Sequence, residues 1–378
     1  MPTRVLLYLP FESPFYNGLY PQIKKGFEQV GCIVEGGCGY LDGDDLLRKI
    51  DSFRPDFVFE MNRSRSEIKG FPKGLRHVCW LVDYWGRRFE TLDDADFLYL
   101  FSRTWLKLHQ EFRGNHLDVL HPGTDPDLYY PVSRAAVDPS VIFLGHMTKP
   151  WLEPELDRSI PTLTGGTIKF KEMVPRIHAY ISNPPKLANH TSLWDYFNIN
   201  LDEINDSKLY YDLTTRLFRE GRRLSTINKA LFSKLEINFY GNQDWEYREP
   251  FKDRYKGMLL TPQDMNRAFN QHSAVLHDGN TPHFRVFDGI AAGLLVFKPD
   301  TQNDEWDGLN FEEGIDVISY RLDSPGLGEK KQLQTLFQKD LQQVRREKIL
   351  TSHTWAHRAC KIMQDLNASR QSHPSKES

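Results

Sequence analysis

The segment HFRVFDGIAAGLLVFKPDT, which runs from His283 to Thr301, decides the fold. Its apolar spacing predicts an amphipathic helix that starts after His283 and ends at Gly293. The apolar run after the glycine predicts a buried strand, and small residues join the two elements. A helix that leads directly into a buried strand is typical of α/β domains built on a parallel sheet.

The same alternation continues on both sides of this segment. Apolar runs predict further strands of one sheet at Val141–His146, Leu235–Gly241, 257–260, Ser273–Asp278 and 315–320. Between the first two runs, residues 150–234 are polar with scattered aromatics, and their second half has a helical pattern. A structureless loop of that length is rare in a compact domain, so we expect a helical insertion. This C-terminal domain is placed at residues 138–350.

The N-terminal part, residues 1–133, predicts a second domain of the same class. Its expected strands are Val5–Leu9, Asp56–Glu60, His77–Val82, Phe97–Phe101 and Leu117–Leu120, and its expected helices are Leu19–Gln29, Asp44–Ser52 and Thr104–Phe112. The strands are mostly continuous apolar runs, as strands covered on both faces must be. The Pro/Gly/Asp-rich stretch 121–131 predicts the crossover between the domains. Helices are expected at 330–351 and 354–367, followed by a disordered polar tail at 369–378.

Composition excludes several classes of protein. The 378 residues carry a net charge of -3, with 26% charged and 13% aromatic residues, which is typical of a folded water-soluble chain and argues against a large nonspecific nucleic-acid footprint. No apolar run is long enough for a spanning helix, and no cleavage site follows the first strand, so we expect a cytoplasmic protein. The four cysteines match no zinc or redox spacing. The acidic run 93–96 predicts a capped turn rather than a metal site.

The start of the helix after His283 is suited to bind an anion. A helix N-terminus presents unpaired N–H groups and a partial positive charge, and Arg285 lies in its first turn. Asp288 follows one turn later, where a carboxylate on the same side can accept the hydroxyl protons of a ribose or sugar. The alternative is an exposed ion pair between Arg285 and Asp288, worth a few tenths of a kcal/mol. The residues alone leave both explanations open.

The stretch RVFDGIAAG, Arg285 to Gly293, resembles the C-terminal donor-site motif of GT-B glycosyltransferases, especially the spore-maturation CgeB-like family. That family usually has Glu where Asp288 stands, and retaining GT-B enzymes often have an acid where Asn280 stands. The resemblance extends over about residues 77–365. It implies two Rossmann-like domains that face a cleft, with the helix at 354–368 completing the N-terminal domain.

Other segments occur in the order that this resemblance requires. FLGH, which ends at His146, is similar to the first strand of the donor domain, and INFYG, which ends at Gly241, is similar to the strand after the helical region. The resemblance thus implies a donor site formed by Gly145, His146, Tyr240, Gly241, His283, Arg285, Val286 and Asp288. It implies no metal and no cofactor beyond the nucleotide-sugar co-substrate, for which a UDP-sugar is favoured.

Two acidic residues in the N-terminal domain are candidate catalytic groups for the acceptor. Asp83 follows the predicted strand His77–Val82, and Glu12 lies in the loop after the first strand. Ligands of open α/β sheets bind at the carboxyl ends of the strands, where both residues are expected. Either carboxylate can serve as the base or the orienting group for an acceptor hydroxyl. A capping role in its loop is the alternative for Asp83.

The resemblance implies metal-independent transfer of a sugar to a glycan, a protein or a small-molecule acceptor. Two alternatives remain open. A phage-type DNA glycosyltransferase shares the fold but needs a basic acceptor groove, to which the clusters Arg63–Lys69 and Arg216–Arg223 are candidate contributors. A non-catalytic protein that only binds nucleotide-sugars is favoured by Asp288 in place of Glu and disfavoured by the presence of Arg285.

Overall fold

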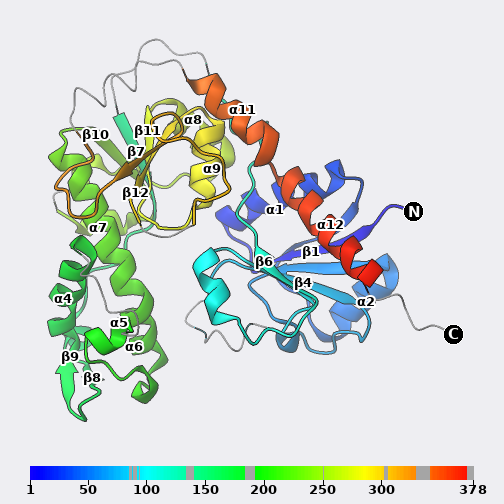
Figure 1. The fold of residues 1–378 in the computed structure, drawn as a ribbon, viewed down its shortest axis with the longest axis horizontal. Helices are drawn as coiled ribbons and strands as arrows, with labels where there is room; N and C mark the ends of the chain where they lie inside the picture. The colour runs from blue at the N-terminus through cyan, green and yellow to red at the C-terminus, as the bar shows by residue number, and fades with distance from the viewer. Residues whose placement is uncertain are drawn as a thin grey trace.

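The computed structural model describes residues 1–84, 87, 92, 94–132, 140–183, 192–249, 251–301, 305–328 and 341–372. This part of the chain forms two α/β domains, each built around a parallel sheet (Figure 1). The predicted fold class, two Rossmann-like domains with a helical insertion in the second, is confirmed. None of the helices in these residues combines the length and apolarity that a bilayer crossing needs.

The N-terminal sheet has six parallel strands in the order β2-β1-β3-β4-β5-β6. The strands are β1 (Arg4–Leu9), β2 (Ile33–Cys38), β3 (Phe57–Met61), β4 (Arg76–Leu81), β5 (Phe97–Leu100) and β6 (His116–Val119), and helices α1 (Pro14–Gln29) and α2 (Gly43–Phe53) lie between the first three. The sequence did not predict β2, because this edge strand contains a glutamate and two glycines instead of an apolar run. The helix expected at Thr104–Phe112 is a short 3-10 helix, η3 (Arg103–Leu108).

The C-terminal sheet has five parallel strands in the order β10-β7-β11-β12-β13. They are β7 (Ser140–Leu144), β10 (Glu236–Tyr240), β11 (Ala274–Leu276), β12 (Leu295–Pro299) and β13 (Val317–Tyr320), and helices α8 (Pro262–Asn270), α9 (Phe284–Ala291) and α11 (Gln342–Ser352) pack around them. The deciding segment therefore forms the predicted helix and strand, α9 and β12. The strand predicted at 257–260 is absent. The exposed side chains of Met258 and Leu260 are not covered as a central strand requires.

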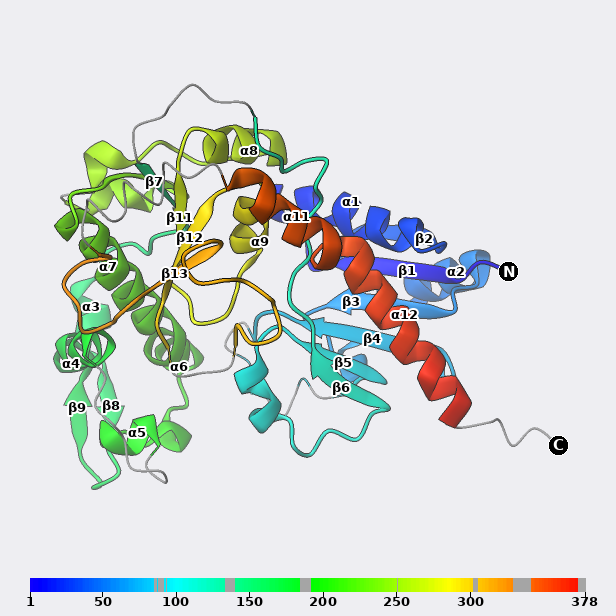
Figure 2. The same cartoon turned by 45° about the horizontal axis from the view of Figure 1, so that its top comes forward.

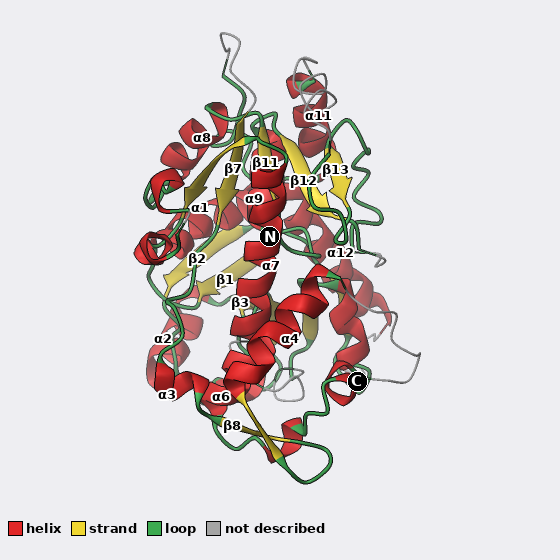
Figure 3. Ribbon diagram, turned by 90° about the vertical axis from the view of Figure 1, so that its left-hand side faces the viewer, coloured by secondary structure: helices red, strands yellow, loops and turns green. Residues whose placement is uncertain are grey.

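The insertion between β7 and β10 forms an arm with a core of its own (Figures 1 and 3). It contains α3 (Glu153–Leu156), the hairpin of β8 (Ser159–Pro161) and β9 (Thr167–Lys169), α4 (Phe170–Ser182), α5 (Leu193–Tyr196), α6 (Ser207–Tyr211) and α7 (Leu217–Phe232). A π-helical turn joins α6 to α7. The predicted helices are present, and the hairpin is an addition to them. Helix α7 returns from the arm to the C-terminal sheet.

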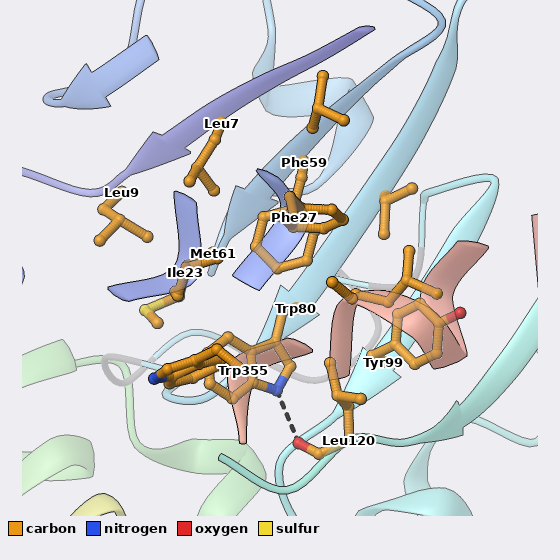
Figure 4. Close-up of a cluster of buried hydrophobic side chains, with 14 of the residues drawn as sticks. Leu7, Leu9, Ile23, Phe27, Phe59, Met61, Trp80, Tyr99, Leu120 and Trp355 are labelled. Atoms are coloured by element: carbon orange, nitrogen blue, oxygen red, sulfur yellow. Dashed lines mark hydrogen bonds between the residues drawn. The ribbon is translucent and has the colours of Figure 1, made fainter. Parts of the chain in front are cut away.

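The last helix, α12 (Trp355–Ser372), leaves the C-terminal domain and packs along α1 of the N-terminal domain (Figure 2). Trp355, Ala359, Ile362 and Leu366 belong to the N-terminal hydrophobic core. In that core Trp355 packs edge-on against Trp80, whose indole N–H donates to the carbonyl of Leu120 (Figure 4). The helix continues four residues into the segment 369–378 that was expected to be disordered, and the remainder lies outside the described residues.

Candidate functional site

The guanidinium of Arg285 lies at the carboxyl edge of the C-terminal sheet. It is carried by the first turn of α9, and its Nη1 donates to the carbonyl oxygen of Leu144 at the end of β7, at 2.7 Å. Its Nη2 pairs with the carboxylate of Asp278 and lies 3.3 Å from Nδ1 of His277, both just after β11. The Arg285 side chain is 12% exposed. Arg285 therefore joins the ends of two neighbouring strands, where ligands of parallel sheets bind.

A second arginine reaches the same carboxylate from the insertion. Nε of Arg223, on α7, lies 3.1 Å from Oδ2 of Asp278. Burial alone would raise the pKa of Asp278, but the adjacent Arg285 and Arg223 hold it well below its usual range. Burial lowers the pKa of Arg223 to about 10, which still leaves the guanidinium charged at neutral pH. One carboxylate is thus shared by two buried guanidinium groups.

Two further arginines of α7 stand close to this pair. Arg222 acts electrostatically on Asp278, and Arg219 acts on Arg222 and Arg223. Within the described part of the chain, neither of these two forms an ion pair. We call Arg219, Arg222, Arg223 and Arg285 the arginine cluster: the last three act on Asp278, and Arg219 lies beside Arg222 and Arg223. Its four positive charges face one negative charge, so it is an electrostatically favourable site for an anion.

The histidines of this region stay neutral because burial, and after it the neighbouring arginines, lower their pKa values. Burial first, and then Arg223 and Arg219, lower the pKa of His146. Burial and Arg285 lower the pKa of His277 to about 3 and that of His283 well below its ordinary value. His283 is the N-cap residue of α9, and its ring packs edge-on against Phe101 of the N-terminal domain. These side chains add hydrogen-bonding groups to the cluster without adding charge.

The predicted glycines Gly145 and Gly241 bring two loops of the sheet together. A Cβ atom at Gly241 would lie 2.2 Å from the carbonyl oxygen of Gly145, so the close approach of these backbones requires glycine. The amide of Gly145 donates to Tyr240, and the amide of Asn242 donates to Nδ1 of His146, each at 2.9 Å. The two loops therefore form one unit beside the arginine cluster.

Tyr240 and Val286 face away from the arginine cluster. Tyr240 lines a separate groove of about 460 Å³, whose other lining residues are Ser140, Glu236, Asn238, Lys256, Gln271 and His272. Val286 is fully buried in the apolar core between the sheet and α9. Their side chains therefore belong to a groove and a core that contain none of the four arginines.

The structure places Asp288 against the crossover between the domains. Its carboxylate accepts a hydrogen bond of 2.6 Å from Oγ1 of Thr124, and the residue is 7% exposed. Burial raises the pKa of Asp288 to about 8. The surface ion pair considered for Arg285 and Asp288 does not form, because Arg285 pairs with Asp278 instead. Arg285 and Asp288 are only one helical turn apart, but Arg285 contacts Asp278 and Asp288 contacts the crossover at Thr124.

In the N-terminal domain, Asp83 and Glu12 follow β4 and β1 at the carboxyl edge of the sheet. The amide of Asp83 donates to Oδ1 of Asn62 at 2.9 Å, and the charge of Asp83 adds to burial in raising the pKa of Tyr16 to about 12. Glu12 lines a groove of about 560 Å³. Its other lining residues are Ser13, Pro14, Asn17 and Gly18 from the start of α1, and Leu260, Thr261, Pro262 and Gln263 from the start of α8. Glu12 thus lies in a groove between the domains.

Several members of the two basic clusters suggested for a DNA groove form ion pairs within the chain. Arg63 is buried and pairs with Glu60, and Arg65 pairs with Asp96. Arg216 pairs with Asp212 and Glu155 and lies 3.6 Å from the centre of the Trp151 ring. The structure divides the second cluster. Its last members, Arg219, Arg222 and Arg223, turn toward Arg285, and their helical spacing was the signal that they share a region of α7.

Metal-binding chemistry has one candidate location among the described residues. The ligand atoms of His116, Asp118 and Asp365 lie within 4.8 Å of one another. The ammonium of Lys361 donates to Asp118 at 2.6 Å and to Asp365 at 3.1 Å, so this group forms an ion-pair network between β6 and α12. All four cysteines are free thiols.

A family model matches the part of the chain that contains the arginine cluster. Residues 219–364, less than half of the chain, match a family model described as glycosyl transferase-like. The chain is also similar to the crystal structure of a Listeria monocytogenes protein provisionally described as a UDP-N-acetylglucosamine 2-epimerase. That similarity has a TM-score of 0.40 and 9% identity, and it covers 100% of this chain and 99% of the other. A search of curated proteins found no match. The region that matches the glycosyl transferase-like model includes all four arginines of the cluster.

Proposed function

We propose that the protein is a metal-independent GT-B glycosyltransferase of the CgeB-like kind, which binds a nucleotide-sugar on its C-terminal domain and transfers the sugar to an acceptor held by its N-terminal domain. The observation that carries the proposal is the arginine cluster at the carboxyl edge of a parallel sheet, where Arg285 and Arg223 pair with one carboxylate and two further arginines lie beside them. This cluster lies within the glycosyltransferase-like region.

A diphosphate is the anion that fits this arrangement. Guanidinium groups bind phosphate oxygens through paired, charge-assisted hydrogen bonds, and the two phosphates offset the excess positive charge that Asp278 leaves uncompensated. During transfer, negative charge grows on the nucleoside diphosphate leaving group. The arginines, together with the N-terminus of α9, stabilise that charge in the way that a bound metal does elsewhere. A UDP-sugar is the favoured donor.

Donor-site roles are proposed for residues that adjoin the cluster. His146 and His283 supply neutral hydrogen-bonding rings, and the loop of Gly145 and Gly241 brings backbone groups to the same edge. Asp288 is left out of the proposed donor contacts, because its carboxyl group is buried against Thr124. Asp288 instead holds the crossover between the domains through this hydrogen bond.

The acceptor is proposed to enter between the domains. The groove beside Glu12 is lined by carboxylate, hydroxyl and amide side chains, which suit the hydroxyl groups of a glycan, a protein side chain or a small molecule. Asp83 is the proposed base for the reacting hydroxyl, and Glu12 is the second candidate. No contact in the described residues favours DNA as the acceptor.

The experiment that tests the proposal measures release of nucleotide from UDP-, GDP- and dTDP-sugars, with and without candidate acceptors. We expect one nucleotide class to be released, and sugar to be transferred when a suitable acceptor is present. A protein that binds a nucleotide-sugar tightly and releases no nucleotide with any acceptor would instead be the non-catalytic binding protein.

The Asp83→Asn variant separates catalysis from binding. Asparagine keeps the shape of the side chain but cannot accept a proton, so we expect the transfer rate to fall by about a hundredfold or more. Donor affinity, measured on the same preparation by isothermal titration, should stay at the wild-type value because the arginine cluster is unchanged. Near-normal transfer by this variant would remove Asp83 from the mechanism and direct attention to Glu12.

A further inference from the structure

Asn62 has a left-handed backbone conformation, and its side chain accepts two hydrogen bonds from the neighbouring strand end. It directly follows β3, with φ of 60° and 1% exposure. Asparagine tolerates this left-handed conformation better than most residues, but it still costs free energy relative to extended backbone. Such conformations persist where the surrounding contacts hold them, and they cluster at functional sites.

The side-chain oxygen of Asn62 holds the end of the neighbouring strand. Oδ1 accepts from the amide of Val82 at 2.6 Å and from the amide of Asp83 at 2.9 Å. These are the first two amides after β4, where the sheet no longer supplies acceptors. The backbone of Asn62 is itself held, because its amide donates to Trp80 at 2.9 Å and its carbonyl accepts from Arg87 at 2.8 Å. The backbone at Asp83 is therefore fixed by one rigid, buried acceptor.

The side-chain nitrogen of Asn62 is buried without a hydrogen-bond partner among the described residues. Leaving a buried donor unpaired costs free energy, and a side chain selected only to cap a strand would gain by avoiding this cost. The amide therefore combines a strained backbone, two bonds to the strand end and one unused donor at the carboxyl edge of the sheet. This combination is typical of side chains that position a functional group.

We propose that Asn62 is a positioning residue for the acceptor reaction: its side-chain oxygen fixes the turn at Val82 and Asp83 and thereby orients the Asp83 carboxylate toward the acceptor hydroxyl. The inference rests on the proposed function, in which Asp83 is the base. Misorientation of a reacting group by about 1 Å costs on the order of a hundredfold in rate. Asn62 thus contributes to transfer without touching the substrate's reacting atoms.

The test compares Asn62→Gly, Asn62→Asp, Asp83→Asn and the double variant Asn62→Gly/Asp83→Asn. Glycine adopts the left-handed conformation without strain, so the first variant removes only the side chain. Aspartate keeps an oxygen that can accept from both amides. The assay is run at about pH 8, above the ordinary range of carboxyl pKa values, so that the added charge leaves Asp83 ionised.

We expect Asn62→Gly to lower kcat for transfer by roughly a hundredfold with unchanged donor KM, and Asn62→Asp to recover most of that loss. The double variant should be no slower than Asp83→Asn alone, because both changes remove the same function, that of the Asp83 carboxylate. Wild-type kcat in Asn62→Gly, or additive losses in the double variant, would overturn the inference. If Asp83→Asn transfers sugar at the normal rate while Asn62→Gly is slow, Asp83 is not the base and Asn62 does not act through it. If Asn62→Gly lowers thermal stability and donor affinity together with kcat, the role of Asn62 is purely structural and the inference fails.

Discussion

At the scale of single residues, Asp278 and Asp288 show how position decides the charge of two carboxyl groups in one strand–loop–helix segment. Asp278 lies between Arg285 and Arg223, which keep it ionised despite its burial. Asp288 is equally buried, but its carboxyl group accepts from the Thr124 hydroxyl instead of an arginine, and desolvation raises its pKa to about 8. The sequence suggested Asp288 as an acid near a ligand and did not indicate that it is neutral, or that Asp278 joins the arginines.

The pH dependence of stability tests the state of Asp288. Its folded-state pKa of about 8 exceeds its ordinary value of 3.8, so the native state keeps a proton that the unfolded chain releases. The stabilising contribution is complete below about pH 4 and is lost as the pH rises through 8. Asp288→Asn, which stays neutral, should therefore lose less unfolding free energy than the wild type between pH 5.5 and 8.5 in urea titrations. The exposed Asp202→Asn variant is the control and should follow the wild type. Parallel curves for all three proteins would contradict this assignment.

At the scale of elements, the apolar runs predicted most strands of both sheets, because a strand covered on both faces needs a continuous apolar sequence. They failed at the edge strand β2, where Glu35 and two glycines interrupt the run, and at 257–260, where apolar side chains remain exposed. The arginine cluster could be predicted only in part. Arg285 was identified from its place at the start of α9, but the contribution of α7 depends on how the insertion folds back, which no local pattern encodes.

Because α12 packs closely on α1, a single methyl group added at Gly26 should lower the stability of the protein. A Cβ atom at Gly26, on α1, would lie 2.6 Å from the backbone carbonyl carbon of Trp355. Gly26→Ala should therefore force the two helices apart and destabilise the protein by about 1–3 kcal/mol in denaturant unfolding. Gly37→Ala is the matched control, since a Cβ atom at Gly37 meets nothing within 4 Å. Its unfolding free energy should change by no more than about 0.5 kcal/mol. Equal stability of the two variants would show that α1 and α12 do not approach this closely in solution.

At the scale of the whole molecule, the two domains are joined by buried contacts as well as by the crossover. Phe284, the first residue of α9, packs within the N-terminal core. The fully buried carboxylate of Glu305, from the C-terminal domain, accepts hydrogen bonds from the Ser102 hydroxyl and from the amides of Arg103 and Thr104. Since α9 also carries Arg285, the helix that faces the proposed donor is held by both domains. Donor binding and domain closure are therefore expected to be coupled.

The central claim is that the arginine cluster binds the diphosphate of a nucleotide-sugar, and isothermal titration of UDP into wild type, Arg223→Ala and Arg267→Ala tests it most directly. Arg223 belongs to the cluster, whereas Arg267 on α8 is 71% exposed and serves as the control. A charge-assisted hydrogen bond contributes about 1.5–3 kcal/mol, so Arg223→Ala should weaken binding at least tenfold while Arg267→Ala binds as the wild type does. Equal affinity of all three proteins for UDP would contradict the claim and place the diphosphate elsewhere.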